Sequence, residues 1–252
     1  MSSPIFTGVG VALVTVFDAD GGLRPAETAA HAAELVAAGL DAVVVAGTTG
    51  EAMSLDAEER DTLIAAVRAE LGGRVPVIAG TGAPSARQAV ELSRRAAAAG
   101  ADGLLVLSPP RVPDPRPYYE RVAAAVEVPV LGYHFPDVSP PGLPLDGLAE
   151  LPIVGLKDSG GDPDRLAREV TVFPDGVYVG RHALALQARA VGCSGVILAM
   201  ANLDPAGCLA AWGGDGEAQR RLVVDHLDAG SIPALKQRLA EQKGIDPSVR
   251  IG

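Results

Sequence analysis

The chain has 252 residues, 48% of them hydrophobic and only 4% aromatic, so it can form one large domain with a mostly aliphatic core. Its formal net charge of -10 argues against nucleic acid or an anionic membrane surface as a partner. The apolar runs are short and interrupted, and the first residues lack a basic and then apolar stretch, so neither a membrane span nor a secretory signal is expected.

The short apolar runs of the chain recur at regular intervals and predict strands. These runs begin near Gly8, Ala42, Val75, Gly103, Val128, Ile153, Gly176 and Ser194, and the first strand is expected to end at Thr15. Their mean spacing is about 27 residues, which suits one strand and one helix per unit. Within each run the apolarity is continuous rather than alternating, which is typical of parallel strands covered on both faces.

Alanine-rich stretches between these runs carry helix start and stop signals. We expect helices from Pro25 to Ala38, after Asp56 with Glu59 as its capping partner, from Ser85 to Ala99, and from Pro205 to Trp212. Glycines follow the first three of these segments, as is common at helix ends.

Eight strand–helix units predict an α/β fold, a closed (β/α)8 TIM barrel over residues 1–212. Residues 213–252 are expected to form a short helical C-terminal extension of the same domain. The alternative is a doubly wound open sheet. That fold usually has a glycine-rich phosphate turn after its first strand, and none follows the first apolar run here.

The two cysteines and four histidines give no sign of a metal site. Cys193 and Cys208 lie in apolar stretches and are expected to be buried free thiols, which favours a reducing, cytoplasmic location over a disulfide. The histidines lack the spacing of metal ligands, so structural or polar-contact roles are expected for His134 and His182. We expect no metal and no cofactor.

Lys157 is the residue with the strongest chemical signal. The other two lysines, Lys236 and Lys243, fall in a polar C-terminal tail, whereas Lys157 lies in the apolar run 153–159. A lysine buried in a strand tends to lose its proton, and a neutral amine attacks carbonyl carbon. The alternative is a lysine at a strand end whose amine lies in solvent or pairs with Asp158.

Two further strand ends complete a chemically consistent set, because barrel active sites lie where the strands end. The turn Gly47-Thr48-Thr49-Gly50-Glu51 can hold an anion such as a carboxylate, although it can also be an ordinary turn. Tyr133 offers a phenol for proton transfer, or else it is a core aromatic residue. Lysine, phenol and anion cradle together suit a 2-oxo acid substrate.

With these motifs the chain resembles the dihydrodipicolinate synthase / N-acetylneuraminate lyase family over nearly its whole length. The resemblance rests on 47–51, on Tyr133 with Pro136, on Gly155-Leu156-Lys157-Asp158, and on Gly195-Val196-Ile197 with Asn202. It implies a class I aldolase in which Lys157 forms a Schiff base with pyruvate and Tyr133 relays a proton. It also implies that Thr48 and Thr49 hold the carboxylate, that Thr48 orients Tyr133, and that Gly47 and Ile197 line the pyruvate site.

The chain departs from the family pattern at two places that bear on the second substrate. Val138 stands where the synthases have an arginine for that substrate's carboxylate, and Pro109-Pro110-Arg111 stands where they have a tyrosine pair. Arg111, Arg181 or His182 is therefore expected to contact the distal part of the substrate, with a solvated surface role as the alternative for the arginines.

The expected activity is a carbon–carbon lyase or aldolase acting on pyruvate and a 2-oxo acid, such as a 2-keto-3-deoxy sugar acid or a 4-hydroxy-2-oxo acid. The alternatives are a dehydratase that uses the same lysine, dihydrodipicolinate synthase itself, or a barrel that binds 2-oxo acids without turnover. The resemblance also implies a homo-oligomer, a dimer or a tetramer.

Overall fold

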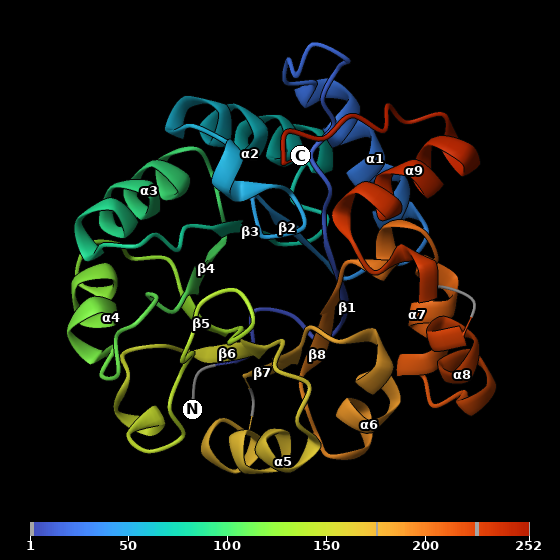
Figure 1. The fold of residues 1–252 in the computed structure, drawn as a ribbon. Helices are drawn as coiled ribbons and strands as arrows, with labels where there is room; N and C mark the ends of the chain where they lie inside the picture. Colours follow the sequence, from blue (N-terminus) through green and yellow to red (C-terminus); the bar gives the residue numbers. More distant parts are fainter. Residues whose placement is uncertain (1–2, 175, 225–226, 252) are drawn as a thin grey trace.

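The computed structural model describes residues 3–174, 176–224 and 227–251. Within them, parallel strands close into a barrel in chain order, and β1 pairs with β8 (Figure 1). The strands are β1 (Gly8–Ala12), β2 (Ala42–Val45), β3 (Val77–Gly80), β4 (Gly103–Leu107), β5 (Val130–His134), β6 (Gly155–Asp158), β7 (Val177–Val179) and β8 (Gly195–Leu198). The predicted (β/α)8 barrel is confirmed, and the open sheet is excluded.

Helices surround the barrel as an outer ring (Figure 1). They are α1 (Pro25–Ala37), α2 (Ala57–Leu71), α3 (Ala86–Ala98), α4 (Arg116–Ala123), α5 (Pro163–Val172), α6 (Ala185–Ala190), α7 (Pro205–Trp212), α8 (Gly216–Val224) and α9 (Ile232–Lys243). The capping box of α2 is present as predicted: Asp56 accepts from the Glu59 amide, and Glu59 accepts from the Asp56 amide.

Strand starts agree with the predicted positions to within two residues, but the first strand ends earlier than predicted. It ends at Ala12 rather than at Thr15. The Thr15 hydroxyl instead donates to the Gly50 carbonyl at 2.7 Å, so the segment after β1 supports the turn after β2.

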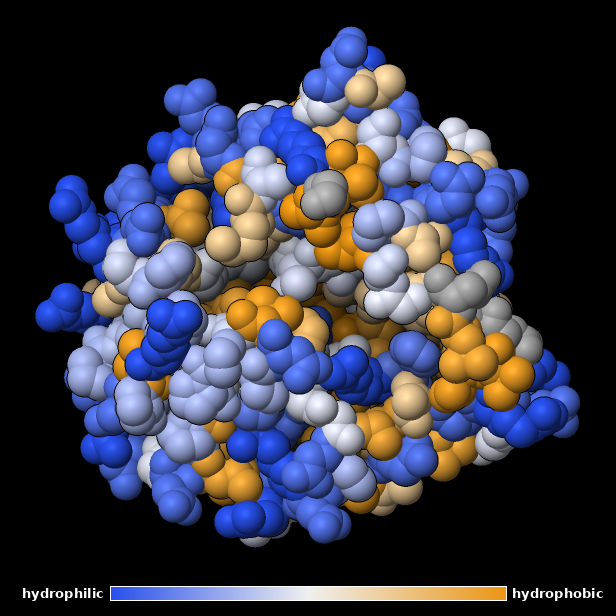
Figure 2. Space-filling view, viewed as in Figure 1, coloured by the Kyte–Doolittle hydropathy of each residue, from blue (hydrophilic) through white to orange (hydrophobic). Residues whose placement is uncertain are grey.

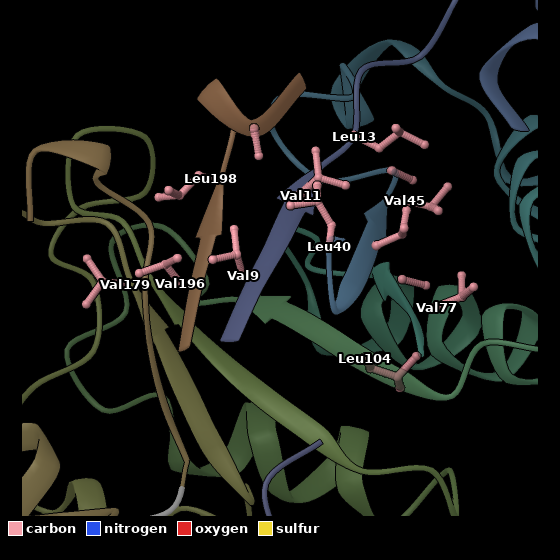
Figure 3. Close-up of a cluster of buried hydrophobic side chains, with 14 of the residues drawn as sticks. Val9, Val11, Leu13, Leu40, Val45, Val77, Leu104, Val179, Val196 and Leu198 are labelled. Carbon is pink, nitrogen blue, oxygen red and sulfur yellow. The ribbon is translucent and has the colours of Figure 1, made fainter. Parts of the chain in front are cut away.

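Side chains on alternate strand positions form two apolar layers. Figure 3 shows part of the outer layer, between strands and helices, with Val9 and Val11 on β1 and Val196 and Leu198 on β8. The inner layer fills the barrel, and it includes Phe6, Ile78, Leu105, Leu131, Tyr178 and Ile197. The rings of Phe6 and Tyr178 stack at 4.5 Å, and the Tyr178 hydroxyl donates to the Phe6 carbonyl. Because Phe6 precedes β1, this pair closes the end of the barrel at which the strands begin.

The C-terminal segment packs across the turn that follows β2, and this corrects the prediction that Lys236 lies in a polar tail. The Lys236 side chain on α9 is completely buried, with Nζ 2.6 Å from Glu51 Oε1 and 2.7 Å from the Ser248 carbonyl. The second Glu51 oxygen accepts from the amides of Arg250 and Ile251. The chain end therefore lies beside α2 (Figure 1) and contributes to the wall of the barrel opening.

The cysteine prediction is confirmed, since Cys193 and Cys208 are both free and buried. Burial raises the pKa of the Cys193 thiol to about 12. Among the residues that the structure describes, no helix is long and apolar enough to span a membrane.

Candidate active site

Lys157 points into the barrel from β6, where it lies in register with Tyr133 on β5 and Tyr178 on β7. Its side chain is 5% exposed, and Nζ lies 4.6 Å from the centre of the Tyr133 ring. No carboxylate in the described part of the chain pairs with this amine. Asp158, one position further along the strand, points to the opposite face and pairs with Arg165 at 3.2 Å. The alternative that Lys157 pairs with Asp158 is therefore wrong.

The Tyr133 hydroxyl receives a hydrogen bond that the sequence reasoning missed. Ser159 Oγ donates to it at 3.3 Å. Ser159 follows Lys157 by two residues, so the alternation of side chains along a strand could have placed both on the inner face. Among the described residues no hydrogen bond joins Thr48 to Tyr133, so an orienting role for Thr48 remains a prediction.

A cavity of about 410 Å³ surrounds these groups where the strands end. Figure 2 shows the corresponding hollow at the centre of this face, with hydrophobic residues around it. The cavity is within the size range of small-molecule sites. Predicted site residues that line it are Lys157, Tyr133, Thr48, Thr49, Ile197, Arg181 and His182. Gly47 lines a smaller compartment next to it.

The turn after β2 is held so that two backbone amides remain available. Glu51 and Ala46 adopt left-handed backbone conformations, with φ of 55° and 52°. The Glu51 amide donates to the Thr48 carbonyl, whereas the amides of Thr48 and Thr49 donate to no other described residue. Since both threonines line the cavity, the geometry is suited to binding a carboxylate there.

The three residues predicted for the distal substrate differ in position. Arg111 is exposed, has φ of 62°, and does not line the cavity. Arg181 lies at the rim, where it donates to the Ser159 carbonyl at 2.8 Å and pairs with Asp137 at 2.6 Å. His182 is half-buried and lines the cavity. The structure thus brings Arg181 and His182, but not Arg111, to the lysine.

Gly180, which follows β7, makes room for the lysine side chain. A Cβ at this position would lie 2.8 Å from Lys157 Cε and 1.9 Å from Ser159 Oγ. Both contacts are too close for real atoms, so any side chain here displaces the lysine or the serine.

We therefore expect Gly180→Ala to slow reaction of the Lys157 amine with a ketone by at least about tenfold, because the reacting atom would be moved by a large fraction of an ångström. The measurement is the rate of covalent capture of pyruvate at Lys157. Gly216→Ala is the matched control, since a Cβ there meets nothing within 4 Å. Equal rates in the two variants would contradict this role of Gly180.

Behind Lys157, on the outer face of the sheet, lies a buried charged cluster. Arg165 Nε on α5 contacts Asp158 at 3.2 Å and Glu169 at 2.6 Å. Burial, followed by the Asp158 charge, raises the pKa of Glu169 to about 8. Burial and then Arg165 lower the pKa of His134 to about 4, and its Nδ1 accepts from the Leu143 amide at 2.9 Å. His134 thus has a structural role, as expected.

This cluster predicts a pH-dependent stability. Folded Glu169 keeps its proton up to about pH 8, whereas its ordinary pKa is 4.5, so the free energy of unfolding should fall as pH rises between these values and level off above them. Glu169→Gln removes this titration. The free energy of unfolding of the variant minus that of the unmodified chain should therefore be larger at pH 8.5 than at pH 6.5. Urea unfolding at both pH values measures the difference, and a constant difference would contradict the assignment.

Comparison with known proteins extends the likeness beyond these residues. The model of the family described as the dihydrodipicolinate synthetase family matches residues 5–211. The chain is 42% identical over 207 residues to an uncharacterized DapA-like lyase of Halobacterium salinarum, covering 79% of this chain and 68% of that one. It is 37% identical over 270 residues to a 4-hydroxy-tetrahydrodipicolinate synthase of Thioalkalivibrio sulfidiphilus, covering 98% and 91% of the two chains.

Two solved structures give the same result in three dimensions. A chloride-inhibited dihydrodipicolinate synthase from Acinetobacter baumannii, complexed with pyruvate, superposes with a TM-score of 0.89 at 31% identity, covering 98% of this chain and 92% of that one. YagE, a prophage protein of the dihydrodipicolinic acid synthase family from E. coli K12, also in complex with pyruvate, has a TM-score of 0.89 at 27% identity, with 97% and 91% covered.

Proposed function

Because the chain belongs to the dihydrodipicolinate synthetase family, we propose that Lys157 forms a Schiff base with the ketone carbon of pyruvate or of a longer 2-oxo acid. The similar lyases and synthases indicate a class I, pyruvate-dependent carbon–carbon lyase. Under this proposal the substrate is a 4-hydroxy-2-oxo acid or a 2-keto-3-deoxy sugar acid, which is cleaved to pyruvate and an aldehyde or assembled from them.

The observation that carries the proposal is a buried amine without a counter-ion beside a phenol. The Lys157 side chain is 5% exposed, and no carboxylate pairs with its amine among the described residues. Lys236 is also buried and provides the contrast, since Glu51 and Ser248 bind its ammonium. Of the two buried lysines, only Lys157 lines the cavity.

In the cleavage direction the neutral amine adds to carbon two of the 2-oxo acid and gives a carbinolamine. The Tyr133 phenol, oriented by Ser159, donates its proton to the carbinolamine hydroxyl, which leaves as water, so that an iminium ion and a phenolate remain. The bond between carbons three and four then breaks, its electron pair forms an enamine, and the Tyr133 phenolate takes the proton of the carbon-four hydroxyl, with the substrate carboxylate on the Thr48 and Thr49 amides. Protonation of the enamine and hydrolysis release pyruvate and regenerate Lys157.

Reduction with borohydride in the presence of pyruvate tests the proposal. We expect one reduced pyruvate on Lys157 by peptide mass spectrometry, and none on Lys236 or Lys243, which serve as internal controls. In Tyr133→Phe the adduct should still form, while turnover should fall by at least about a hundredfold. An unmodified Lys157 would refute the Schiff base, and unchanged turnover would remove Tyr133 from the proton transfer.

Product analysis with the same enzyme separates cleavage from dehydration. Cleavage releases pyruvate from a 4-hydroxy-2-oxo acid, whereas a dehydratase loses water and keeps the carbon chain. Adduct formation without any product across such acids would support the barrel that binds without turnover.

A further inference from the structure

A second compartment, of about 140 Å³, adjoins the lysine cavity on the side of β3 and β4. We call it the side compartment. The apolar side chains that line it are Met53, Leu105, Leu107, Val138, Ile232 and Ile251. Gly80 and Gly82 contribute backbone to its wall. A dry apolar cavity of about this size can hold a benzene molecule.

Two ionisable side chains also line the wall, and both are hydrogen-bonded within the protein. The Arg60 guanidinium donates to the carbonyls of Gly80, Leu55 and Ala52, and no described carboxylate pairs with it. Both Glu51 oxygens are bound, one to Lys236 and the other to the amides of Arg250 and Ile251. Because these donors and acceptors are already engaged, a hydroxylated chain entering the compartment would lose its hydration with few matching hydrogen-bond partners.

The side compartment and the lysine cavity share part of their lining. Thr48, Tyr133, Val138 and Ile232 line both spaces. Tyr133, whose ring lies 4.6 Å from the Lys157 amine, stands at the junction. A 2-oxo acid attached to Lys157, with its carboxylate on the turn after β2, can therefore extend its far end past Tyr133 into the side compartment.

The charge of the junction distinguishes the two routes out of the lysine cavity. Val138, 46% exposed, lines both the side compartment and the lysine cavity and carries no charge. Arg181 lies at the rim among the residues of the lysine cavity only, and it is paired with Asp137. A second carboxylate on that route would meet Arg181 at the rim, whereas in the side compartment it would meet the buried Arg60, whose Nε, Nη1 and Nη2 already donate to carbonyls.

Resting on the proposed function, we propose that the side compartment selects the aldehyde half of the substrate. The group on carbon four is a compact apolar one, a branched alkyl chain or a phenyl ring, rather than a carboxylate or a polyhydroxyl chain. The substrate class is thereby narrowed from 2-oxo acids in general to 4-hydroxy-2-oxo acids with an apolar end.

Calorimetric titration with 2-oxo acids that lack the carbon-four hydroxyl tests this selectivity without turnover. The probes are 5-methyl-2-oxohexanoate, 4-phenyl-2-oxobutanoate and 2-oxoglutarate, which place isopropyl, phenyl and carboxylate groups at carbon four. We expect the first two to bind at least about tenfold more tightly than 2-oxoglutarate, because burial of a few methylene-sized groups is worth that factor. Equal or tighter binding of 2-oxoglutarate would overturn the inference.

Val138→Arg is expected to fold normally, since the Val138 side chain is 46% exposed and the arginine can extend into solvent. It should weaken binding of the isopropyl and phenyl probes by about tenfold and strengthen that of 2-oxoglutarate. Val224→Arg on α8, also exposed at 55%, is the matched control and should change neither. Equal effects of the two variants would also overturn the inference.

The borohydride reaction with pyruvate, run on the same samples, reports separately on the proposed function. If Lys157 is not modified but the apolar probes still bind preferentially, the Schiff base is refuted and the selectivity stands. If Lys157 is modified and 2-oxoglutarate binds best, the selectivity is refuted and the Schiff base stands.

Discussion

The Lys157→Met variant is expected to lose at least about ten-thousandfold in turnover and to form no adduct with pyruvate and borohydride. Methionine has almost the same length and shape as lysine but offers no amine to the ketone carbon. Without the iminium ion, no electron sink exists for the pair released when the bond between carbons three and four breaks. Residual turnover within about tenfold of the unmodified chain would mean that catalysis does not pass through Lys157.

The same variant should remain folded, which separates loss of chemistry from loss of structure. The Lys157 side chain is almost completely buried and no described carboxylate pairs with it, so an apolar side chain of nearly equal size breaks no ion pair and fills the same space. We expect the unfolding temperature of Lys157→Met to be equal to or higher than that of the unmodified chain. Lys243→Met, at an exposed position on α9, is the control and should retain full activity.

The Lys236→Met variant is expected to lower the free energy of unfolding by about 3–5 kcal/mol, the usual cost of breaking a buried ion pair by removing one partner. Lys236 and Glu51 are both inaccessible to solvent, and their charged atoms lie 2.6 Å apart. Burial lowers the pKa of Lys236, and the hydrogen bond that Lys236 donates to Glu51 opposes this shift. Removing the ammonium, which lies 4.5 Å from the centre of the Phe17 ring, leaves the Glu51 carboxylate buried without its cation.

Two comparisons identify the ion pair as the cause. Lys243 lies on the same helix, α9, as Lys236. Lys243→Met breaks only an exposed ion pair with Glu34 at 3.2 Å, so it should lower the free energy of unfolding by less than about 1 kcal/mol. Adding Glu51→Gln to Lys236→Met removes the unpaired charge and should restore part of the loss. Urea unfolding measures all four proteins. A cost for Lys236→Met no greater than that for Lys243→Met would contradict the assignment.

The strand ends that form the barrel opening could be predicted from the sequence, because the patterns that mark strands and helices involve only neighbouring residues. Continuous apolar runs such as Val43-Val44-Val45 reflect burial on both strand faces, and Asp56 with Glu59 forms a capping box through a three-residue spacing. Once eight such units are counted, the strand ends must share one face of the barrel. Lys157, Tyr133 and Thr48 follow from that rule, which is why the lysine cavity contains them.

Residues joined by long separations in sequence could not be placed in this way. The polar neighbours of Lys236 on α9 predict an exposed tail. In the structure Lys236 is buried and pairs with Glu51, which is 185 residues away in the sequence. Arg111 and Arg181 both follow predicted strands, so the sequence does not distinguish them. In the structure Arg111 has a left-handed backbone, with φ of 62°, and its side chain is exposed away from the cavity. The residues next to a side chain in the sequence do not show which distant residues it contacts in the fold.

The closed barrel and the strand ends at which a lysine, a tyrosine and two threonines meet could be predicted from local patterns, because short-range periodicity and strand alternation fix the face that each side chain occupies. Three features could not be predicted in this way. They are the pairing of Lys236, but not of Lys157, with an acid among the described residues, the contact of Ser159 with the Tyr133 hydroxyl, and the apolar side compartment beside Val138. Pairing and cavity shape depend on the distances between separate strands and helices, and these distances arise only when the whole barrel packs.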